Sequence, residues 1–278
     1  MLDTIENLPD IQDLITEDDT PVDNLPSEKQ QRLLTEPLYS AWAGPPDGRP
    51  FLAAANVGIF SMVRVPPIVP DMFLSLDVEV AQDWWEKAHR SYFIWEFGKP
   101  PDLALEIVSN QVGGEDREKR IKYARMRVGY YVIYDPLRQV MPETLTVLRL
   151  QEAAYQQLDA TRFPALGLGL TLWEGVYEGK QDTWLRWTDA EGVLIPTGKE
   201  LADQERRRAE EEKRRAEEEK RRAEQEKRRA EQADLRAEQA NLRAERAERQ
   251  IADQLTQLEQ MKALLRKAGL DPDAQAGG

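Results

Sequence analysis

Five short apolar runs predict the strands of one sheet in the first part of the chain. Each run is rich in aliphatic or aromatic residues and is bounded by polar or proline-containing segments. The runs comprise residues 51–60, 71–80, 102–109, 130–136 and 145–150. The stretch 154–179 continues with alternating strand and loop patterns. Ahead of the runs, residues 27–42 are typical of a helix with Ser27 as its N-cap.

A polar segment with two adjacent glycines separates the runs 102–109 and 130–136. After the glycines, the sequence predicts about three turns of helix that Asp116 can cap and that end before Gly129. A strand, a helix and a strand in this order form a crossover, which makes the two strands parallel. The closely spaced earlier runs suit antiparallel pairing. The pattern therefore predicts an α+β or mixed α/β fold with a central mixed sheet.

From about Lys199 the pattern changes to a seven-residue repeat, which predicts a long charged helix. Alanine occupies one heptad position and gives way to larger residues near the end. This series is Ala209, Ala216, Ala223, Ala230, Ala237, Ala244, Ile251, Leu258 and Leu265. Because alanine seams associate weakly, the first half fits a solvated spacer as well as a coiled coil. The last three turns have enough apolar surface to associate, and we expect a homo-oligomer that forms through this helix.

These patterns divide the chain into four parts. We expect residues 1–26 to form an acidic disordered tail and residues 27–198 to form one folded domain. Residues 199–268 are the long charged helix, and residues 269–278, which begin with a helix-stopping glycine, are a second disordered tail.

Composition limits the chemistry. Among its 278 residues the chain has no cysteine and one histidine, His89, which excludes disulfides, zinc–thiolate sites and sites of several imidazoles. A metal ion must therefore be held by oxygen ligands, which favours Mg²⁺ or Mn²⁺. The N-terminal segment lacks the pattern of a secretory signal and no apolar run is long enough for a membrane span, so we expect a cytoplasmic protein.

Charge gives a mixed indication about nucleic acids. The net charge of −13 argues mildly against a general nucleic-acid binder. Six basic residues nevertheless crowd the helix that is predicted after the glycines, and a local basic surface can coexist with an acidic total. They are Arg117, Lys119, Arg120, Lys122, Arg125 and Arg127.

Glu106 is the most informative residue of the apolar runs, because a carboxylate in a buried strand is costly unless something pairs with it. Strand alternation puts Asp102 on the same face but about 13 Å away, so the two cannot share one ion. We interpret Asp102 as a turn residue at the strand entrance. Asp71 lies between a proline and the next apolar run, and it can converge with Glu106 on one cation if the two strands pair.

Lys119 is the basic residue that we place beside this cation. It lies in the first turn of the predicted helix, soon after the strand of Glu106, and Lys122 is the alternative. A site that cleaves phosphodiesters needs such a charge to stabilise the reacting phosphate. We interpret Tyr123 as a core residue and His89 as a surface or half-buried residue of a packed loop.

These motifs resemble the PD-(D/E)XK nuclease superfamily and, more closely, its Uma-type restriction endonuclease family. The resemblance covers about residues 26–200 and rests on "VPDMFLSL", "PPDLALEIVSN", "DREKRIKYARMRVGYYVIYDP" and "TWLRWTDAEGVLIPTGKE". It implies a restriction-endonuclease-like sheet flanked by helices and cleavage of DNA that depends on Mg²⁺ or Mn²⁺. Asp71 and Glu106 would hold the metal, and Lys119 would join them as a catalytic residue. The superfamily's strand lysine is Val108 here, and Lys119 matches a lysine that the family supplies from the following helix.

The resemblance also implies that Glu36, in the first predicted helix, is a further acidic ligand. The leading hypothesis is therefore a metal-dependent endonuclease. Two alternatives stay open: a catalytically inactive nuclease fold that acts as an interaction module through its coiled-coil tail, and a phosphoesterase that acts on small nucleotides. The negative net charge and Val108 motivate the first of these alternatives.

Overall fold

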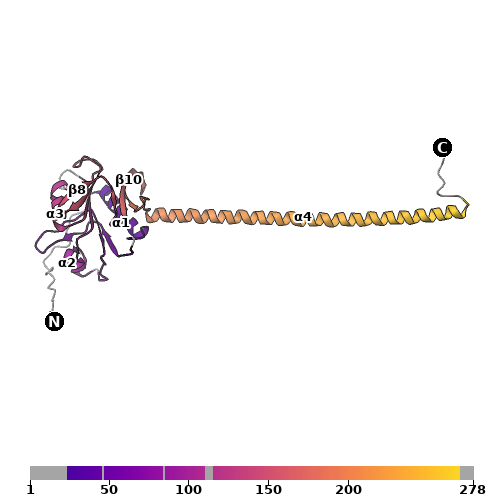
Figure 1. The fold of residues 1–278 in the computed structure, drawn as a ribbon, viewed down its shortest axis with the longest axis horizontal. Helices are drawn as coiled ribbons and strands as arrows, with labels where there is room; N and C mark the ends of the chain where they lie inside the picture. Colours follow the sequence, from indigo (N-terminus) through magenta and orange to yellow (C-terminus); the bar gives the residue numbers. More distant parts are fainter. Residues whose placement is uncertain (1–23, 46, 84, 110–114, 270–278) are drawn as a thin grey trace, which may run out of the picture. The chain divides into compact units, whose positions relative to one another are not determined.

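The computed structural model describes residues 24–45, 47–83, 85–109 and 115–269, with the side chains from residue 117 onward in the last range. The chain divides into two units, Met1–Gln204 and Glu205–Gly278. All β-strands of the described residues lie in the first unit, and Figure 1 labels several of the elements. Asp116, the predicted helix cap, lies outside the described side chains.

A six-stranded mixed sheet forms the centre of the first unit. Its strands, in spatial order, are β1 (Phe51–Ala54), β3 (Met72–Leu76), β5 (Leu103–Ile107), β6 (Tyr130–Tyr134), β7 (Leu145–Gln151) and β8 (Ala154–Leu158). The strands β5 and β6 are parallel, and every other neighbouring pair is antiparallel. The predicted crossover and the predicted α+β class are therefore confirmed.

Two smaller sheets complete the strand content of the described residues. The strands β11 (Lys180–Asp189), β10 (Leu168–Tyr177) and β9 (Arg162–Phe163) form one sheet, and β2 (Ile59–Phe60) pairs with β4 (Tyr92–Phe93) in the other. The run 51–60, predicted as one strand, is split into β1 and β2. Asn56 causes this break, because its φ of 54° is a left-handed conformation that asparagine tolerates better than most residues.

The helices are α1 (Leu25–Ser40), η1 (Lys87–His89), α2 (Ile94–Phe97), η2 (Glu115–Lys119), α3 (Arg120–Met126) and α4 (Gly198–Lys267). Helix α1 is capped by Asn24 and not by Ser27, since the Asn24 side-chain oxygen accepts from the Ser27 backbone N–H at 2.9 Å. Helix α3 ends at Arg127, which takes the left-handed conformation expected of a glycine. Gly129 allows close packing, because a Cβ there would lie 3.1 Å from the Asp102 carbonyl oxygen, a tight contact.

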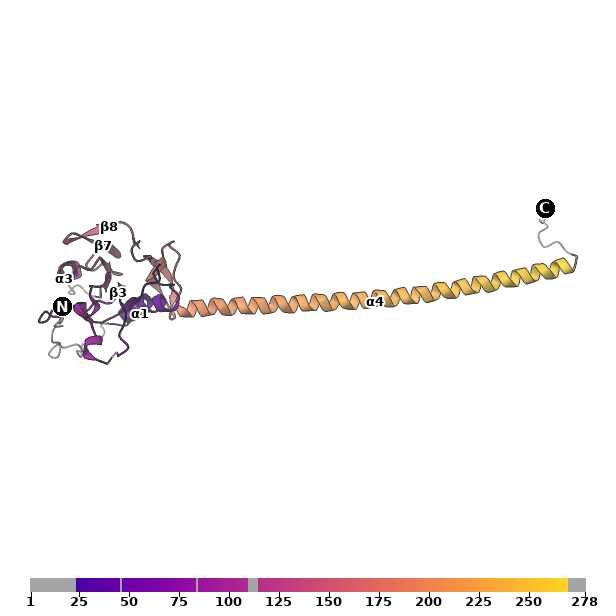
Figure 2. The ribbon, with the colours of Figure 1, turned by 60° about the horizontal axis from the view of Figure 1, so that its bottom comes forward.

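The two faces of the six-stranded sheet pack against different partners. Leu103, Leu105 and Ile107 share one apolar cluster with helix α1 and with residues of β10 and β11. Ala104 and Val108 point to the other face, where they pack with Tyr123 of helix α3. Strand alternation had predicted this division. Figures 1 and 2 show α1 and α3 on opposite sides of the strands, so the sheet lies between two layers.

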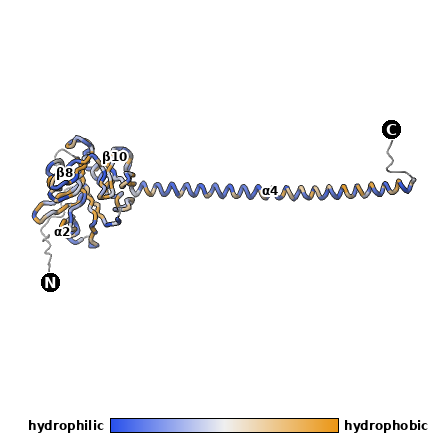
Figure 3. Tube along the Cα trace, viewed as in Figure 1, coloured by the Kyte–Doolittle hydropathy of each residue, from blue (hydrophilic) through white to orange (hydrophobic). Residues whose placement is uncertain are grey.

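Helix α4 begins in the first unit and continues through most of the second. Its first turn is held by Arg186, a buried side chain whose guanidinium donates to both carboxylate oxygens of Glu200 at 2.9 and 2.6 Å. Further along, Glu211 and Arg215 form an i,i+4 ion pair of 2.8 Å. Figure 3 shows a mostly hydrophilic beginning and more apolar positions toward the end of the helix. Within the described ranges, no helix is both long enough and apolar enough to cross a bilayer.

Candidate functional site

Strand register brings Asp71 and Glu106 together. Ala54 of β1, Phe73 of β3 and Ala104 of β5 are paired in one row across the sheet. Continuing the same register by two residues on each strand gives the row Asn56, Asp71 and Glu106. Asn56 and Asp71 are joined through the Gln31 side chain, and Asp71 accepts from the Ile107 backbone N–H next to Glu106, so the three residues lie near one another at this end of the sheet. We call them the polar row.

The carboxyl group of Glu106 is buried, with only 1% of the residue exposed, and both of its oxygens have partners. The Lys119 ammonium donates to Oε2 at 2.8 Å, and the Tyr123 hydroxyl donates to Oε1 at 2.6 Å. Lys119 ends the short π-helical turn η2, and Tyr123 follows one turn later in α3. Since residues four apart lie on one face of a helix, both side chains reach the same carboxyl group.

Asp71 is fixed by two donors from different elements. Its Oδ2 accepts from the backbone N–H of Ile107 at 2.7 Å, so this carboxylate lies against the strand beside Glu106. Its Oδ1 accepts from the Gln31 side-chain amide at 2.7 Å. The side-chain oxygen of Gln31 in turn accepts from the side-chain amide of Asn56 at 2.7 Å. Helix α1 therefore contributes to the site through Gln31, which orients Asp71 and links it to Asn56.

Burial dominates the electrostatics of the site. It raises the pKa of the Glu106 carboxyl to about 8, with a smaller contribution from the negative charge of Asp71, while Lys119 and the Tyr123 hydroxyl oppose the shift. Burial and the neighbouring Glu106 also raise the pKa of the Tyr123 hydroxyl well above its usual range. Tyr123 therefore remains a hydrogen-bond donor, and burial disfavours the negative charge of Glu106 even with Lys119 beside it.

Three other sequence-predicted residues lie away from the polar row. Asp102 accepts from the Leu76 backbone N–H and from Lys99, both at 2.7 Å, which agrees with its predicted role at the strand entrance. Glu36 does not reach the site, because its carboxylate accepts from the backbone N–H of Gly198 at the start of α4. Lys122, the alternative to Lys119, has an exposed side chain.

Sequence reasoning missed Gln31, Asn56 and Tyr123. Tyr123 is a core residue as predicted, but its hydroxyl also binds Glu106. The spacing of Lys119 and Tyr123 could have shown this, because it places both on one helix face. The positive φ of Asn56 and the reach of Gln31 depend on how α1 docks on the sheet, and no local pattern indicates them.

The donor set suits a hard divalent cation. Asp71 and Glu106 offer carboxylate oxygens close to one another at one end of the sheet. Nowhere in the described part do three or more histidine, cysteine or acidic side chains gather as an all-protein cage would require. Two carboxylates nevertheless fit Mg²⁺, which keeps several waters and binds substrate phosphates with its remaining positions.

Comparison with known proteins identifies one family. A family model named Uma2 and described as "putative restriction endonuclease" matches residues 16–174, which is more than half of the chain. The matched segment includes the polar row, Lys119 and Tyr123. No curated protein and no solved structure matches the chain.

The hydrogen bonds predict different stability effects for two conservative substitutions. Asp71→Asn should lower the free energy of unfolding by about 1–3 kcal/mol, because an amide offers one acceptor oxygen to the two donors Ile107 and Gln31. Glu106→Gln should cost less, since the Tyr123 hydroxyl can accept from the new amide as well as donate.

Urea unfolding followed by tryptophan fluorescence measures both effects, because all seven tryptophans precede Gly198 and therefore report on the first unit. A larger loss of stability for Glu106→Gln than for Asp71→Asn would contradict the hydrogen-bond arrangement.

Proposed function

Because the chain belongs to the Uma2 family of putative restriction endonucleases, we propose that it hydrolyses phosphodiester bonds of DNA with the help of Mg²⁺ or Mn²⁺. In this proposal Asp71 and Glu106 hold the metal ion, and Lys119 acts with them as a catalytic residue. One observation carries the proposal: a buried carboxyl group lies in the same row as a second carboxylate and 2.8 Å from a lysine ammonium. The fold alone requires none of these three groups.

Each residue has a distinct role. The cation supplies a Lewis acid for the scissile phosphate and a more acidic water. Asp71 presents its carboxylate in one orientation, because Ile107 and Gln31 fix both of its oxygens. Lys119 contributes a positive charge next to Glu106 that stabilises the charge developing on the phosphate. Tyr123 keeps the Glu106 carboxyl in place from the opposite side of the group.

The helix beside the site supports binding of a phosphate backbone. Arg120 is tied to the Tyr155 carbonyl, but Arg117, Lys122 and Arg125 have exposed side chains. These three side chains lie on the solvent side of the helix, away from the face that contacts Glu106, so they raise the positive potential around the site without bordering the scissile bond. Since the total charge is −13, DNA affinity is modest and falls steeply with salt.

A second candidate function is a catalytically inactive nuclease fold that serves as an interaction module through its helical tail. The observation that favours it is the complete pairing of Glu106, whose two oxygens are already bonded by Lys119 and Tyr123. Such an arrangement is stable without a metal ion. Isothermal titration calorimetry separates the two candidates, because only a nuclease site should bind Mg²⁺ and lose that binding with Asp71→Asn.

We also propose that helix α4 forms a homo-oligomer. Ile251, Leu258 and Leu265 repeat at heptad spacing, and Ile251 and Leu258 are 56% and 54% exposed. Leu255 and Met261 widen the same stripe. A heptad seam of this kind is self-complementary, so the same stripe of a second copy can cover it.

Plasmid cleavage tests the proposed nuclease function. Wild-type protein should nick or linearise DNA with Mg²⁺, and Glu106→Gln, Asp71→Asn and Lys119→Met should each lower the rate by at least about 100-fold. Lys122→Met is the matched control, since it removes an exposed lysine from the same helix and should retain most of the activity. Equal cleavage by wild type and Glu106→Gln would refute the assignment.

Sedimentation velocity tests the oligomer. The wild-type chain should sediment as an oligomer at tens of micromolar, and the double variant Ile251→Ser, Leu258→Ser should sediment as a monomer. Leu235→Ser with Leu242→Ser is the control, because these exposed leucines lie on the opposite side of α4 from Ile251. A monomeric wild type, or an unchanged Ile251/Leu258 variant, would contradict the proposed seam.

A further inference from the structure

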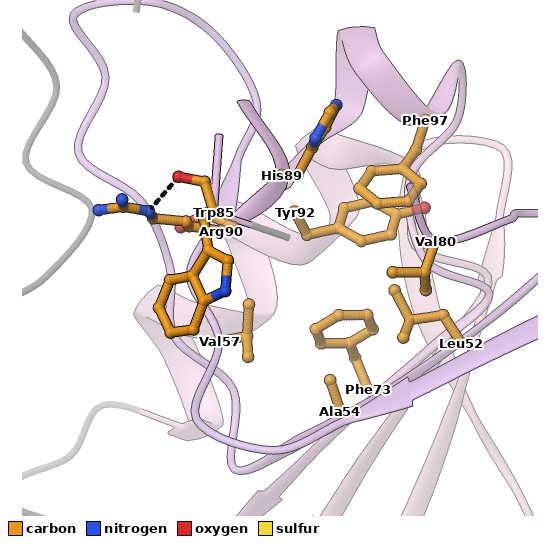
Figure 4. A pocket seen from close by; sticks show the side chains of 11 residues that line it. Leu52, Ala54, Val57, Phe73, Val80, Trp85, His89, Arg90, Tyr92 and Phe97 are labelled. Carbon is orange, nitrogen blue, oxygen red and sulfur yellow. Dashed lines mark hydrogen bonds between the residues drawn. The ribbon is translucent and has the colours of Figure 1, made fainter. Parts of the chain in front are cut away.

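An apolar pocket of about 410 Å³ opens on the face of the sheet that carries the polar row. Its floor is formed by Ala54 and Phe73, which belong to the neighbouring row of the same sheet. Figure 4 shows the remaining side chains around the opening. They are Leu52, Val57, Val80, Trp85, His89, Arg90, Ser91, Tyr92 and Phe97. The pocket is thus built from the sheet and from the segment that joins β3 to β5.

The walls of the pocket are aromatic. Phe73 and Tyr92 are fully buried, and Tyr92 stacks on Phe97 with ring centroids 4.4 Å apart and planes within 3°. Trp85, in contrast, is 82% exposed, and Figure 4 shows its indole across the opening from Tyr92. The loop that holds Trp85 is therefore less packed than the sequence had suggested. An exposed tryptophan next to buried aromatic rings is typical of a surface on which a flat ligand stacks.

The ionisable groups of the lining are basic. Arg90 donates from Nε to the Trp85 carbonyl at 2.9 Å, which holds its guanidinium at the rim, and His89 bonds through Nδ1 to the Asp83 carbonyl. No acidic side chain lines the pocket among the described residues. A ligand with a flat apolar part and a negatively charged part would therefore be complementary to both the walls and the rim.

The pocket is also adjacent to the candidate cleavage site. Ala54 lies two residues before Asn56 and Phe73 lies two residues after Asp71, so the pocket floor and Asp71 are separated by about 7 Å along the sheet. Glu106 points to the face on which the pocket opens, where Tyr123 contacts it. A DNA strand whose phosphate lies at Asp71 and Glu106 would therefore have a neighbouring base next to the pocket.

On this basis we propose that the pocket binds one unstacked base of the DNA strand, with the indole of Trp85 against the base and Arg90 at its phosphate. The inference rests on the proposed nuclease function and adds a substrate class to it. A base can enter only after it leaves the helical stack, so single-stranded or locally distorted DNA is preferred over regular duplex.

The test compares two oligonucleotides of equal charge. The full chain is titrated, in EDTA so that no strand is cut, into a fluorescein-labelled thymidine ten-mer and into a ten-mer of abasic nucleotides. Wild type should bind the thymidine strand about five-fold or more tightly than the abasic strand. Trp85→Ala, at an exposed position, should bind both strands equally. Val80→Trp, which fills the pocket and removes no charge, should also abolish the preference.

Val176→Ala is the control, because it removes an exposed apolar side chain of β10 that does not line this pocket, and it should keep the preference. A wild type without base preference, or a Trp85→Ala variant that retains it, would overturn the inference. Base preference without any Mg²⁺-dependent cleavage would refute the catalytic proposal and leave the pocket assignment standing. Cleavage without base preference would refute only the pocket assignment.

Discussion

The contact between Glu106 and Lys119 is the interaction on which the candidate site depends. Glu106 lies in a strand that is buried on both faces, where an unpaired carboxylate would be strongly destabilising. Lys119 and Tyr123 compensate it, and both come from η2 and α3, which connect β5 to β6. The parallel pairing of β5 with β6 follows from that crossover. One buried acidic group therefore links the topology of the sheet to the position of its most reactive residues.

The sequence predicted those parts of the fold that local pattern determines. Alternation along 102–109 correctly divided its side chains between two faces, and the glycine-rich segment with its helix correctly predicted the crossover. Glu106 could be identified because it interrupts an apolar strand, and Asp71 because it precedes one. What local pattern could not provide was Gln31, whose contact with Asp71 spans forty residues and exists only after α1 docks on the sheet.

Three expectations failed for reasons of geometry. Glu36 was expected at the metal, but it follows Gln31 by five residues, which is about 140° around a helix, so the two cannot reach one site. Its carboxylate instead binds the start of α4. Ser27 was expected as the cap of the first helix, but the helix begins earlier, since prolines are tolerated in a first turn and Asn24 supplies the cap. The aromatic segment after β3 proved more exposed at Trp85 than a packed loop would be.

If Asp71 and Glu106 share one divalent cation, anomalous scattering from a crystal that contains Mn²⁺ should locate that ion between the two carboxylates. One anomalous peak should lie within about 2.0–2.3 Å of an oxygen of each residue, with the Lys119 ammonium next to the Glu106 carboxylate. A crystal at millimolar Mn²⁺ with no peak at these oxygens, and with Glu106 still bonded only to Lys119 and Tyr123, would contradict it.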